Sequence, residues 1–142
     1  MDLIEQGFKE AEEITRHYAK TFYLASNFLP QEKKRFSYAV YAICRLSDEC
    51  VDGARQGNPE EKLKQLREKI ERVYSQGVIS ESLLSSLRYT VIQCHIPKEY
   101  FLELIKGMEM DLVKKRYADF RELHLYCYRA AATVGLIMLK VL

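Results

Sequence analysis

Residues 41–52 decide the fold, and they read Tyr-Ala-Ile-Cys-Arg-Leu-Ser-Asp-Glu-Cys-Val-Asp. On an α-helix, at about 100° per residue, four of the polar side chains in this stretch fall within about 60° of one another. They are Tyr41, Arg45, Asp48 and Asp52. One face of the predicted helix therefore presents a phenol, a guanidinium group and two carboxylates.

The two carboxylates of this helix suggest a specific ligand. Side chains four residues apart are neighbours on a helix, so Asp48 and Asp52 repel each other unless a positive charge or a proton compensates. Mg²⁺ binds one or two carboxylates together with phosphate oxygens, and the planar guanidinium of Arg45 fits a phosphate group. The face thus suits a Mg²⁺–diphosphate ligand. The alternative is a solvated acidic helix end in which Arg45 pairs with Asp48.

Helical periodicity continues along the whole chain, and no segment alternates with the period of a strand. The sequence therefore predicts an all-α bundle of about six helices, in which Asn58, Pro59 and Glu61 form a strong helix start signal. Residues 20–29 are expected to be irregular. The predicted helices span residues 3–19, 30–52, 59–74, 80–94, 97–115 and 119 to the end.

The last predicted helix is unusual because it is apolar on all sides. Residues 130–142 carry a single charge, Lys140. A helix that is apolar all round belongs inside a larger protein or a membrane, and this run is too short to cross a bilayer. The pattern suggests that the sequence ends inside a core whose other half is missing. Alternatively, the other five helices or a second copy of the chain bury this helix.

Composition indicates one soluble globular domain over residues 1–142. Apolar residues make up 48% of the chain, and 22 basic against 20 acidic residues leave a net charge of +2. This balance argues against a nucleic-acid partner, and neither a membrane span nor a signal peptide is visible. The cysteines form no C-x-x-C pair, so we expect reduced thiols in a cytoplasmic protein. They are Cys44, Cys50, Cys94 and Cys127.

A second group of polar residues precedes the second helix. His17, Lys20 and Thr21 lie in the joint before it, where they either contact a phosphate group or face water. No nucleophilic triad and no phosphate-binding glycine loop is present in the sequence.

Three blocks of sequence make the chain similar to a known family. The blocks fall in family order over nearly the whole chain, and on them the sequence resembles the squalene/phytoene synthases. The first block is Thr21–Ala25 with Leu29 and Pro30, and the second is Tyr38–Arg45 with Asp48, Val51 and Asp52. The third is Gly107–Leu112, Arg116 and Tyr117, Tyr126–Arg129, and Thr133–Gly135.

This resemblance implies an isoprenoid-synthase-type helical bundle around an apolar cavity. Family members join two molecules of farnesyl or geranylgeranyl diphosphate head to head, giving phytoene, dehydrosqualene, or presqualene diphosphate and squalene. Mg²⁺ is the implied cofactor, because it promotes loss of one diphosphate. NADPH is implied only for squalene formation.

The resemblance also assigns roles to individual residues. Asp48 and Asp52 match the first aspartate-rich motif and are the implied Mg²⁺ ligands, and Tyr41 is the third implied catalytic residue. Arg45 and Thr21 are the implied contacts of the diphosphate. Phe22, Val134 and Gly135 are the implied lining of the prenyl channel.

The sequence departs from the family pattern in three ways. Glu49 replaces the second of two adjacent aspartates, and Ala132 replaces a glycine, where its methyl group narrows the channel. Family members are also longer, and their second aspartate-rich motif lies beyond the end of this sequence. We therefore expect the chain to correspond to the N-terminal half of a synthase, with little or no turnover on its own.

Two expectations about function and partners remain open. A non-catalytic relative that binds ligands or assists assembly is the alternative to a prenyltransferase. A prenyl diphosphate is the expected substrate, and a separate C-terminal half or a second copy is the expected partner at the apolar last helix. The lipidic substrate is compatible with a cytoplasmic protein that is either free or in contact with a membrane surface.

Overall fold

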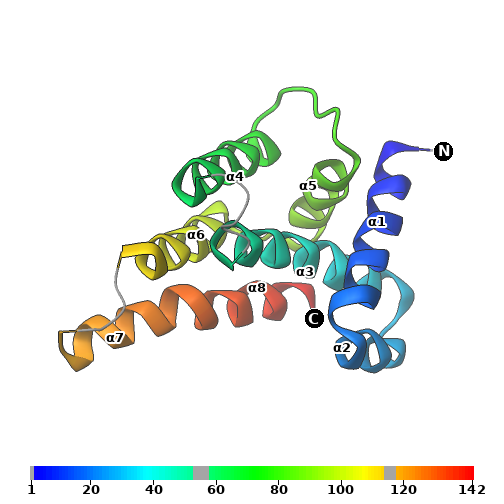
Figure 1. Cartoon of the computed structure of the whole chain (residues 1–142). Helices are drawn as coiled ribbons and strands as arrows, with labels where there is room; N and C mark the ends of the chain where they lie inside the picture. Colours follow the sequence, from blue (N-terminus) through cyan, green and yellow to red (C-terminus); the bar gives the residue numbers. More distant parts are fainter. Residues whose placement is uncertain (1, 53–57, 114–117) are drawn as a thin grey trace.

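The computed structural model describes residues 2–52, 58–113 and 118–142, without the side chains of residues 48, 50–52 and 113. Every regular element in these ranges is helical, as predicted (Figure 1). The elements are α1 (Leu3–Tyr18), α2 (Lys20–Ala25), the 3₁₀-helix η1 (Ser26–Phe28), α3 (Gln31–Asp52), α4 (Pro59–Tyr74), α5 (Ser82–Cys94), α6 (Lys98–Val113), α7 (Phe120–Cys127), the π-helix η2 (Tyr128–Ala132) and α8 (Thr133–Val141).

Local start and stop signals explain several helix ends. The Asn58 side chain accepts a hydrogen bond from the Glu60 amide at 3.0 Å and caps α4. Asp119 caps α7 through the Glu122 amide at 2.8 Å, while the Glu122 carboxylate accepts from the Ala118 amide at 2.6 Å. This reciprocal arrangement satisfies two amides that lack partners within the helix.

The prediction that residues 20–29 are irregular was wrong. Ala19 leaves the helical conformation, with φ −137° and ψ 67°, so the chain turns and then begins a second short helix. The rings of Phe22 and Tyr23 from this helix stack on α3. Because a helix of six residues is marginal without packing, its presence depends on contacts that are distant in the sequence.

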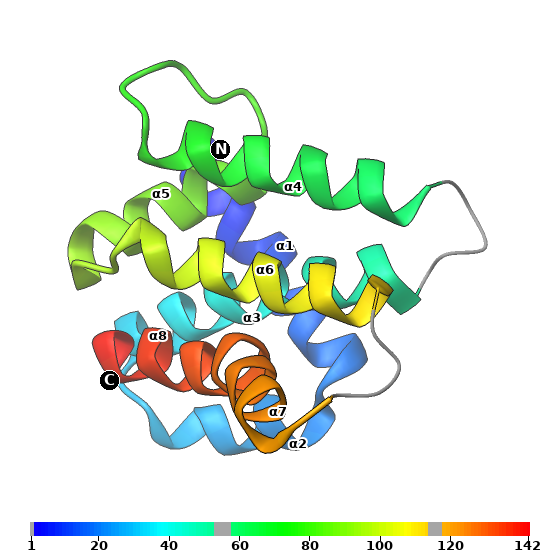
Figure 2. The same ribbon diagram turned by 90° about the vertical axis from the view of Figure 1, so that its left-hand side faces the viewer.

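Helix α3 lies in the middle of the structure and contacts α1, α4, α5, α6 and α8. Figures 1 and 2 show α4 and α2 at opposite edges of the molecule, with α3 between them. Ala39, Val40 and Ile43 supply the inner face of α3 and are buried in it. Apolar side chains that recur every three or four residues place this face in the main core.

The last predicted helix is divided by the π-helix η2 and is buried on one face only. Thr133, Ile137 and Val141 are buried by the other helices, whereas Leu139 and Leu142 are largely exposed. The neighbouring helices therefore cover one face of this segment and leave part of its apolar surface exposed. Among the helices of the described ranges, none is long and apolar enough to cross a membrane.

The crossing of α1 and α5 gives a prediction about stability. A methyl group on Gly7 would overlap the carbonyl oxygen of Ser82 and lie 2.8 Å from Cβ of Ser86. The Gly7→Ala chain should lose about 1–3 kcal/mol in free energy of unfolding, although alanine is favoured within a helix. Urea unfolding followed by circular dichroism measures this change.

Gly135→Ala is the matched control, because a methyl group there would meet no atom within 4 Å. We expect this variant to be unchanged or more stable by up to about 1 kcal/mol. Equal stability of the two alanine variants would show that the α1–α5 contact is not close.

Candidate functional site

The site is built from the ends of α1 and α2 and from the outer face of α3. Phe22 of α2 and Tyr41 of α3 stack, with ring centroids 5.8 Å apart and planes inclined by 25°. The structure thus brings together two predicted site residues that are far apart in the sequence. Their rings form an aromatic surface one helical turn before Arg45.

A second pair of stacked rings joins the same two helices, α2 and α3. Tyr23 and Tyr38 stack with centroids 5.7 Å apart, and the Tyr38 hydroxyl lies 2.5 Å from the Ser26 hydroxyl. Burial raises the pKa of Tyr38, and the hydrogen bond with Ser26 only partly opposes that rise. Tyr38 therefore stays a neutral phenol, and its role is to hold η1 against α3.

Arg45 is held by one contact from the end of α1 and by one from its own helix, α3. Its guanidinium carbon lies 4.1 Å from the centroid of the Tyr18 ring, and its Nε lies 3.4 Å from the Glu49 carboxylate. Nε is buried and makes no well-aligned hydrogen bond in the described structure, while the side chain as a whole is 35% exposed. A cation over an aromatic face is attracted electrostatically, so Tyr18 holds the guanidinium in place without neutralising it.

The backbone of α3 continues without a break through Asp48 to Asp52. Positions 45, 48 and 52 therefore keep the helical register that the sequence predicted, while the two aspartate side chains lie outside the described residues. In the part of the chain whose side chains are described, no group of three His, Cys, Asp or Glu residues is arranged to hold a metal ion. The paired carboxylates of α3 remain the predicted ligands, and their oxygen donors are the type that Mg²⁺ prefers.

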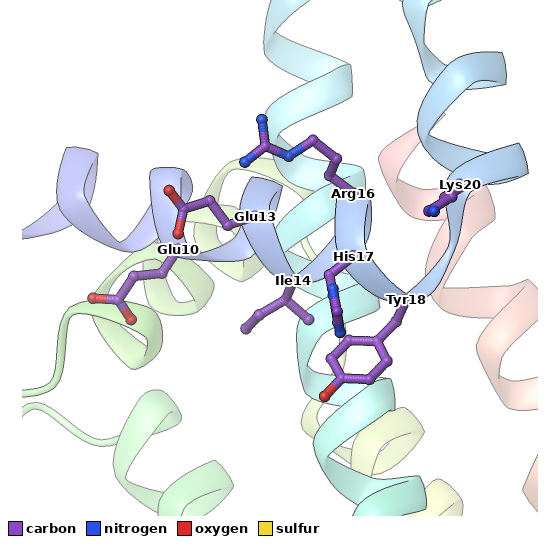
Figure 3. A pocket seen from close by; sticks show the side chains of 7 residues that line it. All are labelled: Glu10, Glu13, Ile14, Arg16, His17, Tyr18 and Lys20. Carbon is purple, nitrogen blue, oxygen red and sulfur yellow. The ribbon is translucent and has the colours of Figure 1, made fainter.

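A surface pocket of about 620 Å³ lies at the end of α1, and its lining includes Tyr18, whose ring lies over Arg45. His17 and Tyr18 pack edge to face within it, with ring centroids 4.5 Å apart, and Lys20 enters from the start of α2 (Figure 3). Thr21 follows on the exposed side of α2. The pocket combines cations and anions, since Arg16, Glu10 and Glu13 also line it.

The two predicted channel residues of α8 differ in their surroundings. Val134 packs against the cluster of Leu63, Leu104 and Met108, whereas Gly135 is exposed. Ala132, the departure from the family glycine, is also exposed. Gly135 and Ala132 therefore lie on the open face of this segment, and the partly buried Val134 side chain packs against the core.

The structure adds two residues to those predicted from sequence. Glu49 pairs with Arg45, an i,i+4 spacing that could have been read from the sequence. Tyr18 covers the same guanidinium, but this contact joins separate helices and leaves no local signal. The alternative predicted above pairs Arg45 with Asp48, whose side chain lies outside the described residues. Among the described side chains, Glu49 is an ion-pair partner of Arg45.

Comparison with known proteins identifies the family. The sequence profile described as squalene/phytoene synthase matches residues 15–142. The chain belongs to the squalene/phytoene synthase family.

Individual relatives cover nearly all of this chain. A chloroplastic phytoene synthase from an Oncidium hybrid cultivar is 36% identical over 99% of the chain and 34% of its own length. The 15-cis-phytoene synthase of Synechococcus elongatus is 34% identical over 98% of the chain and 45% of its own length. The chain thus spans between a third and a half of these relatives.

Solved structures agree with this fold. A dehydrosqualene synthase crystallised with a ligand superposes with a TM-score of 0.88 at 28% identity, over 97% of this chain and 48% of that one. The squalene synthase of Alicyclobacillus acidocaldarius superposes with a TM-score of 0.89 at 28% identity, over 97% and 52%. The isoprenoid-synthase-type fold expected from the sequence is confirmed.

An ion pair positions the segment that precedes Gly135. Nε of Arg129, in the π-helix η2, donates to the Glu103 carboxylate of α6 at 2.9 Å, and the Lys106 ammonium lies 3.3 Å from the other oxygen. Gly107 allows this close approach, because a methyl group there would lie 3.0 Å from the backbone of Arg129 and Ala130. Burial acts to raise the pKa of Glu103, but the hydrogen bonds from Arg129 and Lys106 outweigh it and lower the pKa.

This shift predicts a pH-dependent contribution to stability. A carboxyl group whose pKa is lowered on folding stabilises the fold above its unfolded pKa, near 4.3 for Glu, and loses that effect as pH falls further. We expect Arg129→Met to lower the free energy of unfolding by about 1 kcal/mol at pH 7. The difference from wild type should shrink below about pH 4.

Urea unfolding at neutral and acidic pH measures this difference. Arg121→Met is the control, because Arg121 is exposed on α7 and has no ion pair among those of the described residues. It should have little effect at either pH. A loss in Arg129→Met that is equally large at both pH values would assign its cause to packing instead of charge.

Proposed function

We propose that this chain provides the first metal- and diphosphate-binding face of a synthase that condenses two prenyl diphosphates head to head. One observation carries the proposal. Arg45 is held over Tyr18 one helical turn from the Phe22–Tyr41 stack, so a charged region and an aromatic region adjoin along α3. A prenyl diphosphate has the same division into a charged head and an apolar tail.

At the charged end, Arg45 binds the diphosphate head through its planar guanidinium group, and the Thr21 hydroxyl donates a hydrogen bond to a diphosphate oxygen. Asp48 and Asp52 hold Mg²⁺, which neutralises the leaving diphosphate when it is bound. Because the ring of Tyr18 leaves Arg45 charged, the guanidinium is available to an anion. Glu49 competes for the same guanidinium until the ligand arrives.

At the apolar end, Phe22 and Tyr41 supply a surface for the prenyl chain, and Gly135 leaves room for it on the open face of α8. A surface without charged groups protects an allylic cation from water. Val134 is partly buried against Leu63, Leu104 and Met108, and its remaining surface lines the channel beside Gly135. Among the family's substrates we favour geranylgeranyl diphosphate for this chain, because relatives that it matches are named phytoene synthases. The expected product is then one whose formation needs no NADPH.

Complete turnover, in this proposal, requires residues beyond this sequence. The sequence has one pair of aspartates four residues apart, Asp48 and Asp52. The exposed apolar side of η2 and α8, which includes Tyr128, Leu139 and Leu142, is then the surface on which the remaining part of the synthase fold packs. The relatives are about two to three times as long as this chain, which supports that requirement.

The binding step is testable on the chain itself. Calorimetric titration with farnesyl thiodiphosphate, an analogue that resists ionisation, should show binding that requires Mg²⁺. Asp48→Asn combined with Asp52→Asn should weaken this binding at least about tenfold, and Arg45→Lys should weaken it about ten- to a hundredfold. Asp119→Asn is the matched control, because it removes one carboxylate outside the proposed site and asparagine preserves the cap of α7.

Release of pyrophosphate from geranylgeranyl diphosphate, followed on the same samples, separates binding from catalysis. We expect the wild-type chain to bind the analogue and to release pyrophosphate at or near the background rate. Binding that is independent of Mg²⁺ and unaffected by the two aspartate changes would refute the proposed site and favour a non-catalytic relative.

A further inference from the structure

The side chain of Glu49 takes part in two neighbouring sites. Its carboxylate lies 3.4 Å from Nε of Arg45, and it also lines a second surface pocket, of about 210 Å³, between α3 and α4. Figures 1 and 2 show α4 alongside the C-terminal part of α3. Glu49 is therefore shared between the Arg45 site and the pocket beside α4.

The pocket beside α4 offers Glu49 other cations. Two ammonium groups and one amide line it from α4, and they belong to Lys62, Gln65 and Lys69. These positions are separated by three or four residues, so they share one face of the helix. Lys62 and Lys69 are partly buried, whereas Lys64 of the same helix is exposed. The pocket thus presents positive charge on the side of Glu49 that is formed by α4.

The ion pair between Glu49 and Arg45 is loose. Its length of 3.4 Å exceeds the roughly 2.7–2.9 Å of a charge-assisted hydrogen bond, and Nε of Arg45 makes no well-aligned hydrogen bond in the described structure. The Glu49 side chain is 41% exposed, and exposed pairs of this kind contribute little to stability. Separating the two groups therefore costs little free energy.

A diphosphate on Arg45 would make the present position of Glu49 unfavourable. The bound anion and the Glu49 carboxylate would then lie beside the same guanidinium and repel each other. Asp48 and Asp52 add two further carboxylates to this end of α3. Because Glu49 already lines the pocket beside α4, the nearest alternative cations are those of Lys62 and Lys69.

We propose that Glu49 is a movable counter-ion of the diphosphate site. It pairs with Arg45 in the ligand-free chain, and it turns to Lys62 and Lys69 when a diphosphate binds. This inference rests on the proposed function and deepens it, because it assigns control of Arg45 to a residue that contacts neither the diphosphate nor the metal. Glu49 is in this sense a positioning residue, which acts on the ligand through Arg45.

Glu49→Gln tests this role, because it keeps the shape of the side chain and removes its charge. In calorimetric titration with farnesyl thiodiphosphate and Mg²⁺, this variant should bind about three- to tenfold more tightly than the wild type. A merely structural role of Glu49 would not produce a gain in affinity. Glu68→Gln is the matched control, because Glu68 is exposed on α4 and lines neither pocket. Its affinity should stay within about twofold of wild type.

Lys69→Met tests the other side of the exchange. With one cation of the pocket removed, Glu49 stays on Arg45, and binding of the analogue should weaken about two- to fivefold. In the Glu49→Gln background the same change should have almost no effect, because no carboxylate has to move. Lys64→Met is the control for loss of one positive charge from α4. An equal loss from Lys69→Met in both backgrounds would show that Lys69 attracts the ligand directly, and it would overturn the inference.

The titrations separate this inference from the proposed function. If neither the wild type nor Glu49→Gln binds the analogue, the proposed function fails and the inference fails with it. If the wild type binds and Glu49→Gln binds equally well, the inference alone fails. Weaker binding by Glu49→Gln would assign Glu49 to the metal ligands and would also overturn the inference.

Discussion

Burial of the inner face of α3 is the constraint on which the rest of the structure depends. Ala39, Val40 and Ile43 are almost completely buried where α1, α4, α5 and α8 meet this helix. A helix fixed on one face also has its opposite face fixed, because the Cα–Cβ bonds of one helix keep constant directions relative to one another. The packing of α3 therefore determines where Tyr41 and Arg45 point, without any contact from a ligand.

The site combines this rigid helix with two short contacts from the chain before it. Tyr18 at the end of α1 lies over Arg45, and Phe22 of α2 lies over Tyr41. Because Ala19 turns the chain between them, consecutive segments reach two successive turns of α3. A change in the α1–α2 joint would therefore displace the charged and aromatic parts of the site together.

Much of the fold was predictable because the signals that define it are local. The cap at Asn58 and the periodic apolar residues of α4 predicted Pro59–Tyr74 with the bounds that the structure shows. Helix α2 was not predicted, because it depends on the Tyr23–Tyr38 stack, which is a contact between separate segments of the chain. The Tyr18–Arg45 contact and the packing of Val134 against the core were not predicted for the same reason. The family resemblance supplied the roles of Asp48 and Asp52, which helix geometry alone left open.

The central claim is that the outer face of α3 binds a prenyl diphosphate through Arg45 and a metal held by Asp48 and Asp52. A crystal structure of the chain with Mg²⁺ and farnesyl thiodiphosphate tests it most directly. The diphosphate should lie within hydrogen-bond distance of the Arg45 guanidinium, with Mg²⁺ on the two aspartates and the prenyl chain beside Phe22 and Tyr41. A diphosphate bound elsewhere, with no metal on Asp48 or Asp52, would contradict the claim.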